Sequence, residues 1–231
     1  MPDLREGHFE LPDEESRHAI KVLRAKSGDK FLLTNGKGYS ATAEVVGLDK
    51  RNCTLFVGDM LFHAFKKPEL KMMVCPTKNT DRFEWFLEKA VEIGVSEIIP
   101  VWSNRSERKV EKYDRWNKVL ASALKQSQRF YLPKLHKAVK LNEAITSGVA
   151  GSNLLVAHCM PAINGKEHLL HTLKKDEDAC IAIGPEGDFT EEEVKAMLEN
   201  GAMEISLGDS RLRTETAAVV AVTYFSVVNS L

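Results

Sequence analysis

The first third of the chain alternates apolar and polar residues over short stretches, a pattern typical of β-strands. Residues 31–34 and 41–46 flank the turn sequence Asn-Gly-Lys-Gly at 35–38, which predicts a β-hairpin. Residues 53–57 and 61–65 are expected to form two further strands. Several short strands so close together in the sequence favour a small β-barrel.

From residue 70 onward, short apolar runs alternate with amphipathic stretches that have the period of a helix. Residues 70–75, 95–101 and 154–158 are predicted strands, and residues 81–93 and 111–127 are predicted helices. The first of these helices gathers its apolar side chains on one face: Phe83, Phe86, Leu87, Ala90 and Val91. Repeated strand–helix alternation favours an α/β fold with a mostly parallel sheet, covered by helices on both faces.

A charged link that contains proline, Lys-Lys-Pro at residues 66–68, separates the two patterns. We therefore expect a β-rich domain over residues 1–67 and an α/β domain over residues 68–231. Within the first domain, residues 14–24 carry apolar side chains at helical spacing, so we expect one helix beside the strands.

The composition is that of an ordinary globular protein. Of the 231 residues, 43% are hydrophobic and 28% are charged, and no apolar run reaches the length of a membrane span. The four cysteines are scattered, as is typical of free thiols in a reducing compartment, and we expect a cytoplasmic location. His168 and His171 have the spacing of a metal pair, but no third ligand lies nearby in the sequence, so we expect no metal.

The net charge of −1 hides a strong asymmetry along the chain. Residues 66–140 contain 17 Lys and Arg against 9 Asp and Glu, whereas residues 151–231 contain 6 against 13. A local positive excess of this kind favours a surface for a polyanion such as nucleic acid. The alternative is a set of solvated helix faces that happen to be basic.

A short apolar run at residues 179–183 ends abruptly at the sequence Gly-Pro-Glu-Gly of residues 184–187. Such a run, stopped by glycine and proline, predicts a buried strand that enters a tight loop. Thr190 and Glu193 then have the spacing of a capping box, which predicts that a helix begins directly after the loop.

The same order of strand, glycine loop and helix follows once more. Residues 203–207 are a predicted strand that ends at Gly208, and a helix is expected from Thr214 to about residue 228. Two such loops side by side would lie where open α/β sheets bind their ligands. Either loop alone is equally compatible with a simple turn of the chain, so the pair carries the prediction.

The two loop sequences, GPEGDFTEEE and SLGDSRLRTETAA, resemble the cofactor loops of the SPOUT class of RNA methyltransferases. The resemblance is to the family that methylates N3 of a uridine in small-subunit (16S) ribosomal RNA. It implies a C-terminal α/β domain with a trefoil knot that binds S-adenosylmethionine. The run His18-x-x-x-Val22-Leu23-Arg24 is similar to the start of the PUA-like RNA-binding barrel that precedes the knot in that family.

The resemblance also assigns residues to the cofactor site. Asp188 stands where many relatives have a second glycine, and this difference is expected to adjust the loop without abolishing it. Glycines are required wherever the backbone approaches a ligand closely or adopts a positive φ. The expected cofactor-binding residues are Leu155, Ala157, Gly184, Pro185, Glu186, Gly187, Leu207, Gly208, Leu212, Arg213 and Thr216.

Methylation of uridine N3 makes two chemical demands on such a site. Because a sulfonium is already a good leaving group, the methyl group must mainly be positioned for in-line attack, which needs no metal. N3 is a poor nucleophile while it is protonated, so a group must accept its proton or stabilise the resulting anion. Arg213 is the candidate for stabilising the anion, and Glu215 for accepting the proton or orienting Arg213. A carboxylate at this position is also typical of an ordinary helix start.

The expected partner is ribosomal RNA or the assembled small ribosomal subunit, and the sequence leaves open which of the two is methylated. The predicted last helix is apolar on nearly every side, so we expect the sheet and the second subunit of a homodimer to cover it. The resemblance places RNA contacts at Lys21, Arg24, Lys78, Arg82, Gln126 and Arg129.

Two alternatives stay open at this point. A knotted methyltransferase could act on a ribose 2′-hydroxyl or on another RNA, and a non-catalytic RNA-binding module could keep the same fold. Cofactor binding separates the module from the enzymes, and the identity of the modified nucleoside separates the enzymes from one another.

Overall fold

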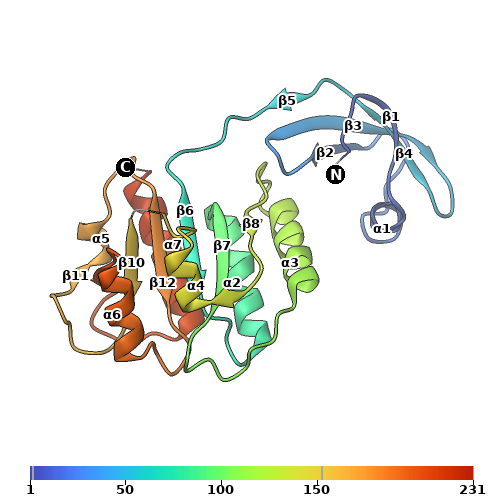
Figure 1. Ribbon diagram of the computed structural model, residues 1–231. Helices are drawn as coiled ribbons and strands as arrows, with labels where there is room; N and C mark the ends of the chain where they lie inside the picture. The colour runs from blue at the N-terminus through green and yellow to red at the C-terminus, as the bar shows by residue number, and fades with distance from the viewer. Residues whose placement is uncertain (2, 152, 231) are drawn as a thin grey trace. The chain divides into compact units, whose positions relative to one another are not determined.

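The computed structural model describes residues 1, 3–151 and 153–230, and its ribbon is shown in Figure 1. The chain divides into two compact units. The first consists of residues 1–65 together with residues 128–131, and the second contains the rest of the described chain. Each unit has hydrophobic core residues of its own, so each is described separately.

An antiparallel sheet of five strands forms most of the first unit. The strands are β1 (Gly7–Glu10), β2 (Lys30–Thr34), β3 (Tyr39–Leu48), β4 (Cys53–Val57) and β5 (Leu61–Phe62). They pair in the order β1-β4-β3-β2, and β5 pairs with β3 outside this path. Side chains alternate along β3, so that Ala41, Ala43 and Val45 lie in the core. The predicted hairpin between β2 and β3 is confirmed, whereas β1 was not expected.

The helix expected at residues 14–24 is shorter and changes its type part-way. The α-helix α1 (Asp13–Arg17) continues directly into a π-helical turn, η1 (His18–Val22). At the end of this turn the Leu23 N–H donates to the carbonyl of His18, at 3.1 Å. Arg24 then adopts a φ of +53°, through which a right-handed helix cannot continue.

A short segment from the middle of the chain, residues 128–131, completes the first unit. The Gly38 N–H donates to the carbonyl of Phe130 at 2.9 Å, and the Tyr131 hydroxyl donates to the carbonyl of His63 at 2.7 Å. The rings of His63 and Phe130 are stacked with their centroids 3.6 Å apart. The segment is too short to show a periodic pattern of apolar residues, so the sequence does not predict that it belongs to the first unit.

An eight-stranded sheet whose pairings are all parallel forms the centre of the second unit. Its strands are β6 (Leu70–Val74), β7 (Glu97–Trp102), β8 (Lys134–Leu135), β9 (Val139–Lys140), β10 (Leu154–Ala157), β11 (Glu167–His168), β12 (Ala179–Ile183) and β13 (Met203–Ser206). The order is β11-β13-β10-β12-β6-β7-β8, and β9 also pairs with β7. The predicted α/β fold with a mostly parallel sheet is confirmed.

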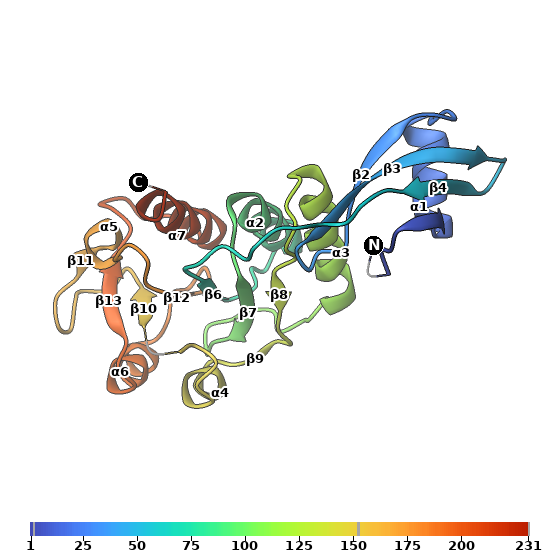
Figure 2. The same cartoon turned by 90° about the horizontal axis from the view of Figure 1, so that it is seen from above.

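Helices cover both faces of this sheet, as Figure 2 shows. One face carries α2 (Thr80–Ile93), α3 (Tyr113–Gln126) and α7 (Thr214–Val228), and the other carries α4 (Leu141–Thr146) and α6 (Glu191–Glu199). Neighbouring residues of one strand serve opposite faces: Met72 packs with the first set of helices and Met73 with the second. Both side chains are fully buried, so two apolar layers hold the sheet in place.

The strands and helices predicted near the carboxyl end are mostly confirmed. Thr190 and Glu193 make both hydrogen bonds of the capping box at the start of α6. Residues 166–174 contain the two-residue strand β11 and the short helix α5 (Leu169–Thr172). Within the single chain, Val227 of the helix α7 is 44% exposed.

Replacing Gly38 by alanine should destabilise the first unit more than the same change at Gly28. The two glycines have φ values of +89° and +91°, so either replacement strains the backbone by about 1–2 kcal/mol. A β-carbon at Gly38 would also overlap the Tyr131 hydroxyl and lie 2.9 Å from the carbonyl oxygen of His63, whereas at Gly28 it meets nothing within 4 Å. We expect Gly38→Ala to lose about 1–3 kcal/mol more of unfolding free energy. Urea unfolding of both full-length variants measures the difference, and equal losses would contradict the prediction.

Candidate functional site

Three parallel neighbours of the second sheet, β10, β12 and β13, end at the same edge. Ala157 is the partner of Ile183 on one side and of Ile205 on the other. The loops that follow these strands therefore leave the sheet together, at the carboxyl edge where α/β proteins place their ligands.

A cavity of about 660 Å³ lies at this edge. Its volume falls in the range typical of sites for small molecules and cofactors. Its walls combine apolar side chains, among them Ile183 and Leu212, with backbone groups of both glycine loops. The lining residues are 157–159, 183–186, 188 and 205–214, together with Lys166 and Ala217.

The first glycine loop is a tight turn in which a side chain at the first position would be crowded. A β-carbon at Gly184 would lie 3.1 Å from the amide nitrogen of Phe189. The Asp188 N–H closes the turn on the carbonyl of Pro185 at 2.9 Å. Asp188 itself has a φ of +65°, a left-handed conformation in which glycine is the easiest residue to place. This conformation explains physically why a glycine suits the position.

The side chain of Asp188 offsets the strain of that conformation by two hydrogen bonds. Its Oδ1 accepts from the Phe189 N–H at 2.8 Å, and its Oδ2 accepts from the Cys159 N–H at 2.7 Å. The second bond ties the first glycine loop to the loop that follows β10. A glycine at this position could not make that connection.

Arg105 holds the first glycine loop from its outer side. Its Nη1 donates to the carbonyls of Gly187 at 3.0 Å and Phe189 at 3.2 Å. Gly187 lies against the Arg105 side chain, since a β-carbon there would be 3.4 Å from the Arg105 Cβ. Sequence reasoning missed Arg105, because it is one of several basic residues in the loop after β7.

The second glycine loop meets the first through a buried hydroxyl. Gly208 has a φ of +129° with open space around it, so backbone conformation alone requires glycine there. Six residues later Thr214, which is 5% exposed, donates its hydroxyl to the carbonyl of Gly184 at 3.0 Å. This hydrogen bond fixes the first residue of α7 against the end of β12.

A buried carboxylate organises the loop that follows β10. Glu204 of β13 accepts hydrogen bonds from the N–H groups of Ile163 and Asn164 and contacts the His158 Nε2 at 2.9 Å. Lys166 donates to the carbonyl of His158 at 2.7 Å from the other end of the loop. His158 and Lys166 both line the cavity, so this network shapes one of its walls.

Burial and the nearby Lys166 lower the pKa of His158 below its usual value. Burial by itself raises the pKa of Glu204, but hydrogen bonds from Asn164, Ile163 and His158 outweigh it and lower that pKa. The neutral His158 ring therefore donates from Nε2 to the Glu204 carboxylate, which can only accept.

Most of the residues expected at the cofactor site line the cavity. They are Ala157, Gly184, Pro185, Glu186, Leu207, Gly208, Leu212 and Arg213. Leu155 is buried in the core, Gly187 packs against Arg105, and Thr216 lies in the first turn of α7. These three are not among the residues that line it.

The two expected catalytic residues lie in different surroundings. Arg213 is exposed and lines the cavity. Glu215 is buried, and its Oε1 lies 3.7 Å from the Nε of Arg82 on α2. Its Oε2 has no hydrogen-bond partner within the described part of the chain. Glu215 is not among the cavity-lining residues and faces a different arginine from the one expected.

The expected RNA-binding residues are distributed over both units. Lys21, Arg24 and Arg129 are exposed in the first unit. The other three, Lys78, Arg82 and Gln126, belong to the second. Lys78 contacts the first glycine loop, because its N–H donates to the Glu186 carboxylate at 3.0 Å.

The described residues provide neither a metal site nor a membrane-spanning helix. No group of three or more His, Cys, Asp or Glu side chains is placed to hold a metal ion. None of the helices described has both the length and the apolar character needed to cross a membrane.

Two family models match the chain. One, described as "RNA methyltransferase domain", matches residues 65–226, and the other, "RNA methyltransferase PUA domain", matches residues 11–57. The first match contains both glycine loops and covers more than half of the sequence. The chain belongs to this RNA methyltransferase family. The resemblance carried by the two loop sequences is thereby confirmed.

Solved structures of this RNA methyltransferase family have the same fold. A probable rRNA-methyltransferase from Porphyromonas gingivalis is 34% identical, with a TM-score of 0.89 over 99% of this chain and 96% of that one. The ribosomal RNA small subunit methyltransferase E from Neisseria gonorrhoeae, bound to S-adenosyl methionine, is 28% identical, with a TM-score of 0.84 over 99% and 96%.

A curated relative from Bacillus subtilis, also a ribosomal RNA small subunit methyltransferase E, is 26% identical over 228 residues. The match covers 94% of this chain and 89% of the relative. The likeness therefore extends over both units and is not confined to the glycine loops.

The buried pair of His158 and Glu204 should make the second unit less stable as the pH falls. Since the folded protein lowers the pKa of His158, the unfolded chain binds the proton more readily. The unfolding free energy should be highest above about pH 6.5, the usual pKa of histidine, and decrease as the pH falls below it. Glu204 adds a further loss below about pH 4.3 for the same reason.

Urea unfolding at about pH 7.5 and about pH 5.5, on either side of the usual histidine pKa, measures this change. His158→Gln keeps a donor for Glu204 but cannot titrate, so its loss between the two pH values should be smaller than that of the wild type. His171→Gln is the matched control in the same unit, because His171 is exposed. A pH dependence that is the same in all three proteins would contradict the prediction.

Proposed function

We propose that this protein transfers a methyl group from S-adenosylmethionine to N3 of a uridine in small-subunit ribosomal RNA. The observation that carries the proposal is the cavity of about 660 Å³ between two glycine loops joined by Thr214 and Gly184. Membership of the RNA methyltransferase family supports the reaction type. The relative with bound S-adenosyl methionine and the same overall fold supports the methyl donor.

The residues of the cavity fit this cofactor. Apolar side chains at Ile183, Leu207 and Leu212 suit a flat adenine, and the nearby loop backbone offers hydrogen-bonding groups to a ring with polar edges. Gly184 carries no side chain, so its backbone is open to a ligand in the cavity that it lines. The carboxylates of Glu186 and Asp188 at the wall complement a cofactor that carries positive charge.

The cofactor, when bound, supplies an activated methyl group, and the protein has to prepare the acceptor base. Arg213 lines the cavity and its guanidinium offers several hydrogen-bond donors, so we assign it the stabilisation of negative charge on a deprotonated uracil. Glu215 lies beside Arg82, so we assign it the positioning of that arginine and not the orientation of Arg213.

RNA contacts are proposed at the six basic and polar residues named from the sequence. Among them, Lys78 binds Glu186, which lines the cavity. Arg82 is held by Glu215, and Lys78 pairs through its Nζ with Glu107 at 2.6 Å. Both side chains keep part of their surface exposed, so they remain available to phosphate groups.

The trefoil knot and the homodimer are part of the same proposal. Strand β13 lies on one side of β10, whereas α7, which follows it, packs on β6, β12 and α2. The loop 207–213 must therefore cross the ends of β10 and β12, and this crossing supports a knot. The partly exposed apolar side chains of α7, such as Val227, supply a surface for a second subunit. Sedimentation that detects only monomer would contradict the dimer.

Methylation of small-subunit rRNA from cells that lack the modification tests the function. With S-adenosylmethionine present, nucleoside analysis should detect 3-methyluridine as the new product. A ribose-methylated nucleoside would favour the 2′-hydroxyl alternative. Cofactor binding without any transfer, either to naked rRNA or to assembled subunits, would contradict the assigned reaction, and failure to bind the cofactor would favour the non-catalytic module.

Arg213→Ala should lower the rate of methyl transfer by about 10²-fold, because a charged donor is lost next to the developing anion. Arg211→Ala is the matched control, since Arg211 is also exposed and lines the same cavity. Single-turnover transfer and calorimetry with S-adenosylmethionine give the two readouts. Normal transfer together with normal cofactor affinity would remove Arg213 from the mechanism.

A further inference from the structure

Three segments of the first unit bring aromatic rings together at one place. They are the turn between β2 and β3, the strand β5 with the residues that follow it, and the inserted segment 128–131. We call this group the aromatic cluster, and it consists of Tyr39, Phe62, His63, Phe65, Phe130 and Tyr131.

The inner part of the aromatic cluster is firmly built. His63 stacks on Phe130 with an interplanar angle of 7°, and its Nε2 lies 2.8 Å from the Ser40 hydroxyl. The Tyr131 hydroxyl donates to the His63 carbonyl, and its ring meets Phe65 edge-on at 4.9 Å. These contacts hold the cluster in a fixed arrangement before any ligand arrives.

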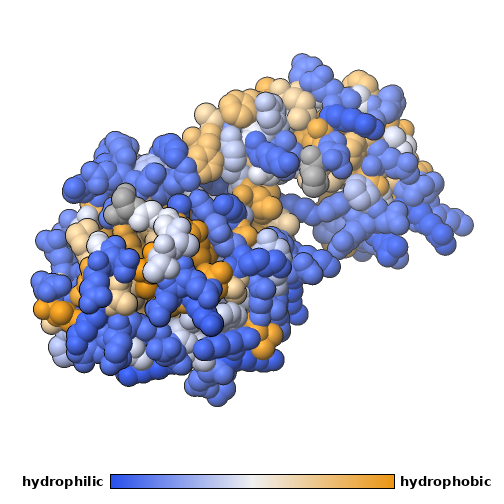
Figure 3. All heavy atoms as spheres, viewed as in Figure 1, coloured by the Kyte–Doolittle hydropathy of each residue, from blue (hydrophilic) through white to orange (hydrophobic). Residues whose placement is uncertain are grey.

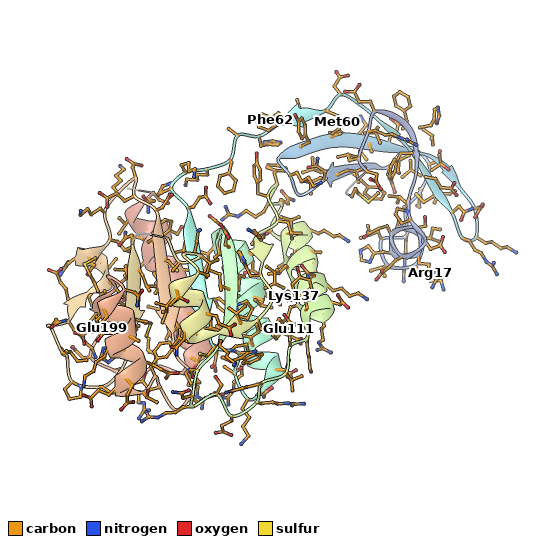
Figure 4. The ribbon with its side chains drawn as sticks, in the orientation of Figure 1. Arg17, Met60, Phe62, Glu111, Lys137 and Glu199 are labelled. Carbon is orange, nitrogen blue, oxygen red and sulfur yellow. The ribbon has the colours of Figure 1, made fainter. Side chains whose placement is uncertain are left out.

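The outer part of the aromatic cluster is open to solvent. Tyr39 is 41% exposed, Phe62 is 62% exposed and Phe65 is 39% exposed. The rings of Tyr39 and Phe62 lie side by side, with centroids 5.1 Å apart. Figure 3 shows hydrophobic side chains gathered over β5, where Figure 4 labels Phe62. Large aromatic rings held rigidly at a surface are typical of a binding site.

The charges near these rings are positive. Lys37 precedes Tyr39 in the turn, and Arg129 precedes Phe130 in the inserted segment; both are exposed. Residues 35–39, 61–65 and 128–131 contain no Asp or Glu. An apolar interface between protein chains is usually depleted of lysine, whereas rings next to cations suit a ligand with flat bases and a phosphate backbone.

We propose that the aromatic cluster binds single-stranded RNA, with bases stacked on Tyr39 and Phe62 and phosphates next to Lys37 and Arg129. The inference rests on the proposed function, since it names how the RNA substrate is held outside the catalytic cavity. Bases stack on aromatic rings without regard to sequence, so the site would hold an unpaired strand of the RNA substrate.

The first test uses a fluorescein-labelled single-stranded RNA with the full-length protein, and fluorescence anisotropy measures affinity. Phe62→Ala and Tyr39→Ala should each weaken binding about tenfold, because one stacking surface is lost. The dependence of affinity on salt should stay as in the wild type, whereas Lys37→Ala should reduce the salt slope by about one phosphate contact.

Phe56→Ala is the matched control. Phe56 is 48% exposed in the same unit, but its ring packs edge-on with His8 and its partner across the strand pair is Glu44. RNA affinity should not change in this variant. Phe62→Trp should keep the affinity, and its additional tryptophan emission should be quenched when RNA is added, which a purely structural role for Phe62 would not produce.

Two further measurements keep the outcomes apart. Calorimetry with S-adenosylmethionine should give the wild-type affinity for Phe62→Ala, since the cluster is not part of the cofactor cavity. If the wild type methylates rRNA while Phe62→Ala binds RNA normally, the stacking site is wrong and the proposed function stands. If Phe62→Ala changes sedimentation without changing RNA affinity, the cluster packs against a second copy and the proposal is overturned.

Discussion

The hydrogen bond from the Thr214 hydroxyl to the carbonyl of Gly184 connects two parts of the chain that are thirty residues apart. It is buried, so water does not compete with it, and breaking it would leave a polar group unsatisfied inside the protein. Together with the pairing of β12 and β13 with β10, this contact sets the relative position of the two glycine loops that line the cavity.

The acidic character of residues 151–231 has a structural explanation. Glu186, Asp188, Glu193 and Glu204 each accept a hydrogen bond from a backbone N–H outside their own strand or turn: Lys78, Cys159, Asn104 and Ile163. A carboxylate is an effective acceptor for backbone donors that have no partner in a sheet or helix. Four of the 13 carboxylates in this region thus fix loops, whereas the positive excess of residues 66–140 fits a role with RNA.

Part of the site could be predicted from the sequence because its signals are local. A strand that stops at Gly184, a capping box at Thr190 and a second strand before Gly208 each depend only on neighbouring residues. The contributions of Arg105 and Glu204 could not be predicted, because they act on carbonyl and N–H groups far away in the chain. The π-helical turn η1 could not be predicted either, since the spacing of apolar residues does not distinguish it from an α-helix.

The inserted segment 128–131 gives the protein an unusual connectivity. The polypeptide leaves the first unit after residue 65, returns for four residues and leaves again after residue 131. A fragment that ends at residue 65 would lack the Phe130 ring that stacks on His63. It would also lack the Tyr131 hydroxyl that donates to the carbonyl of His63. The first unit is therefore complete only together with four residues that follow α3 in the chain, so its stability depends on a segment that lies outside its own continuous stretch of sequence.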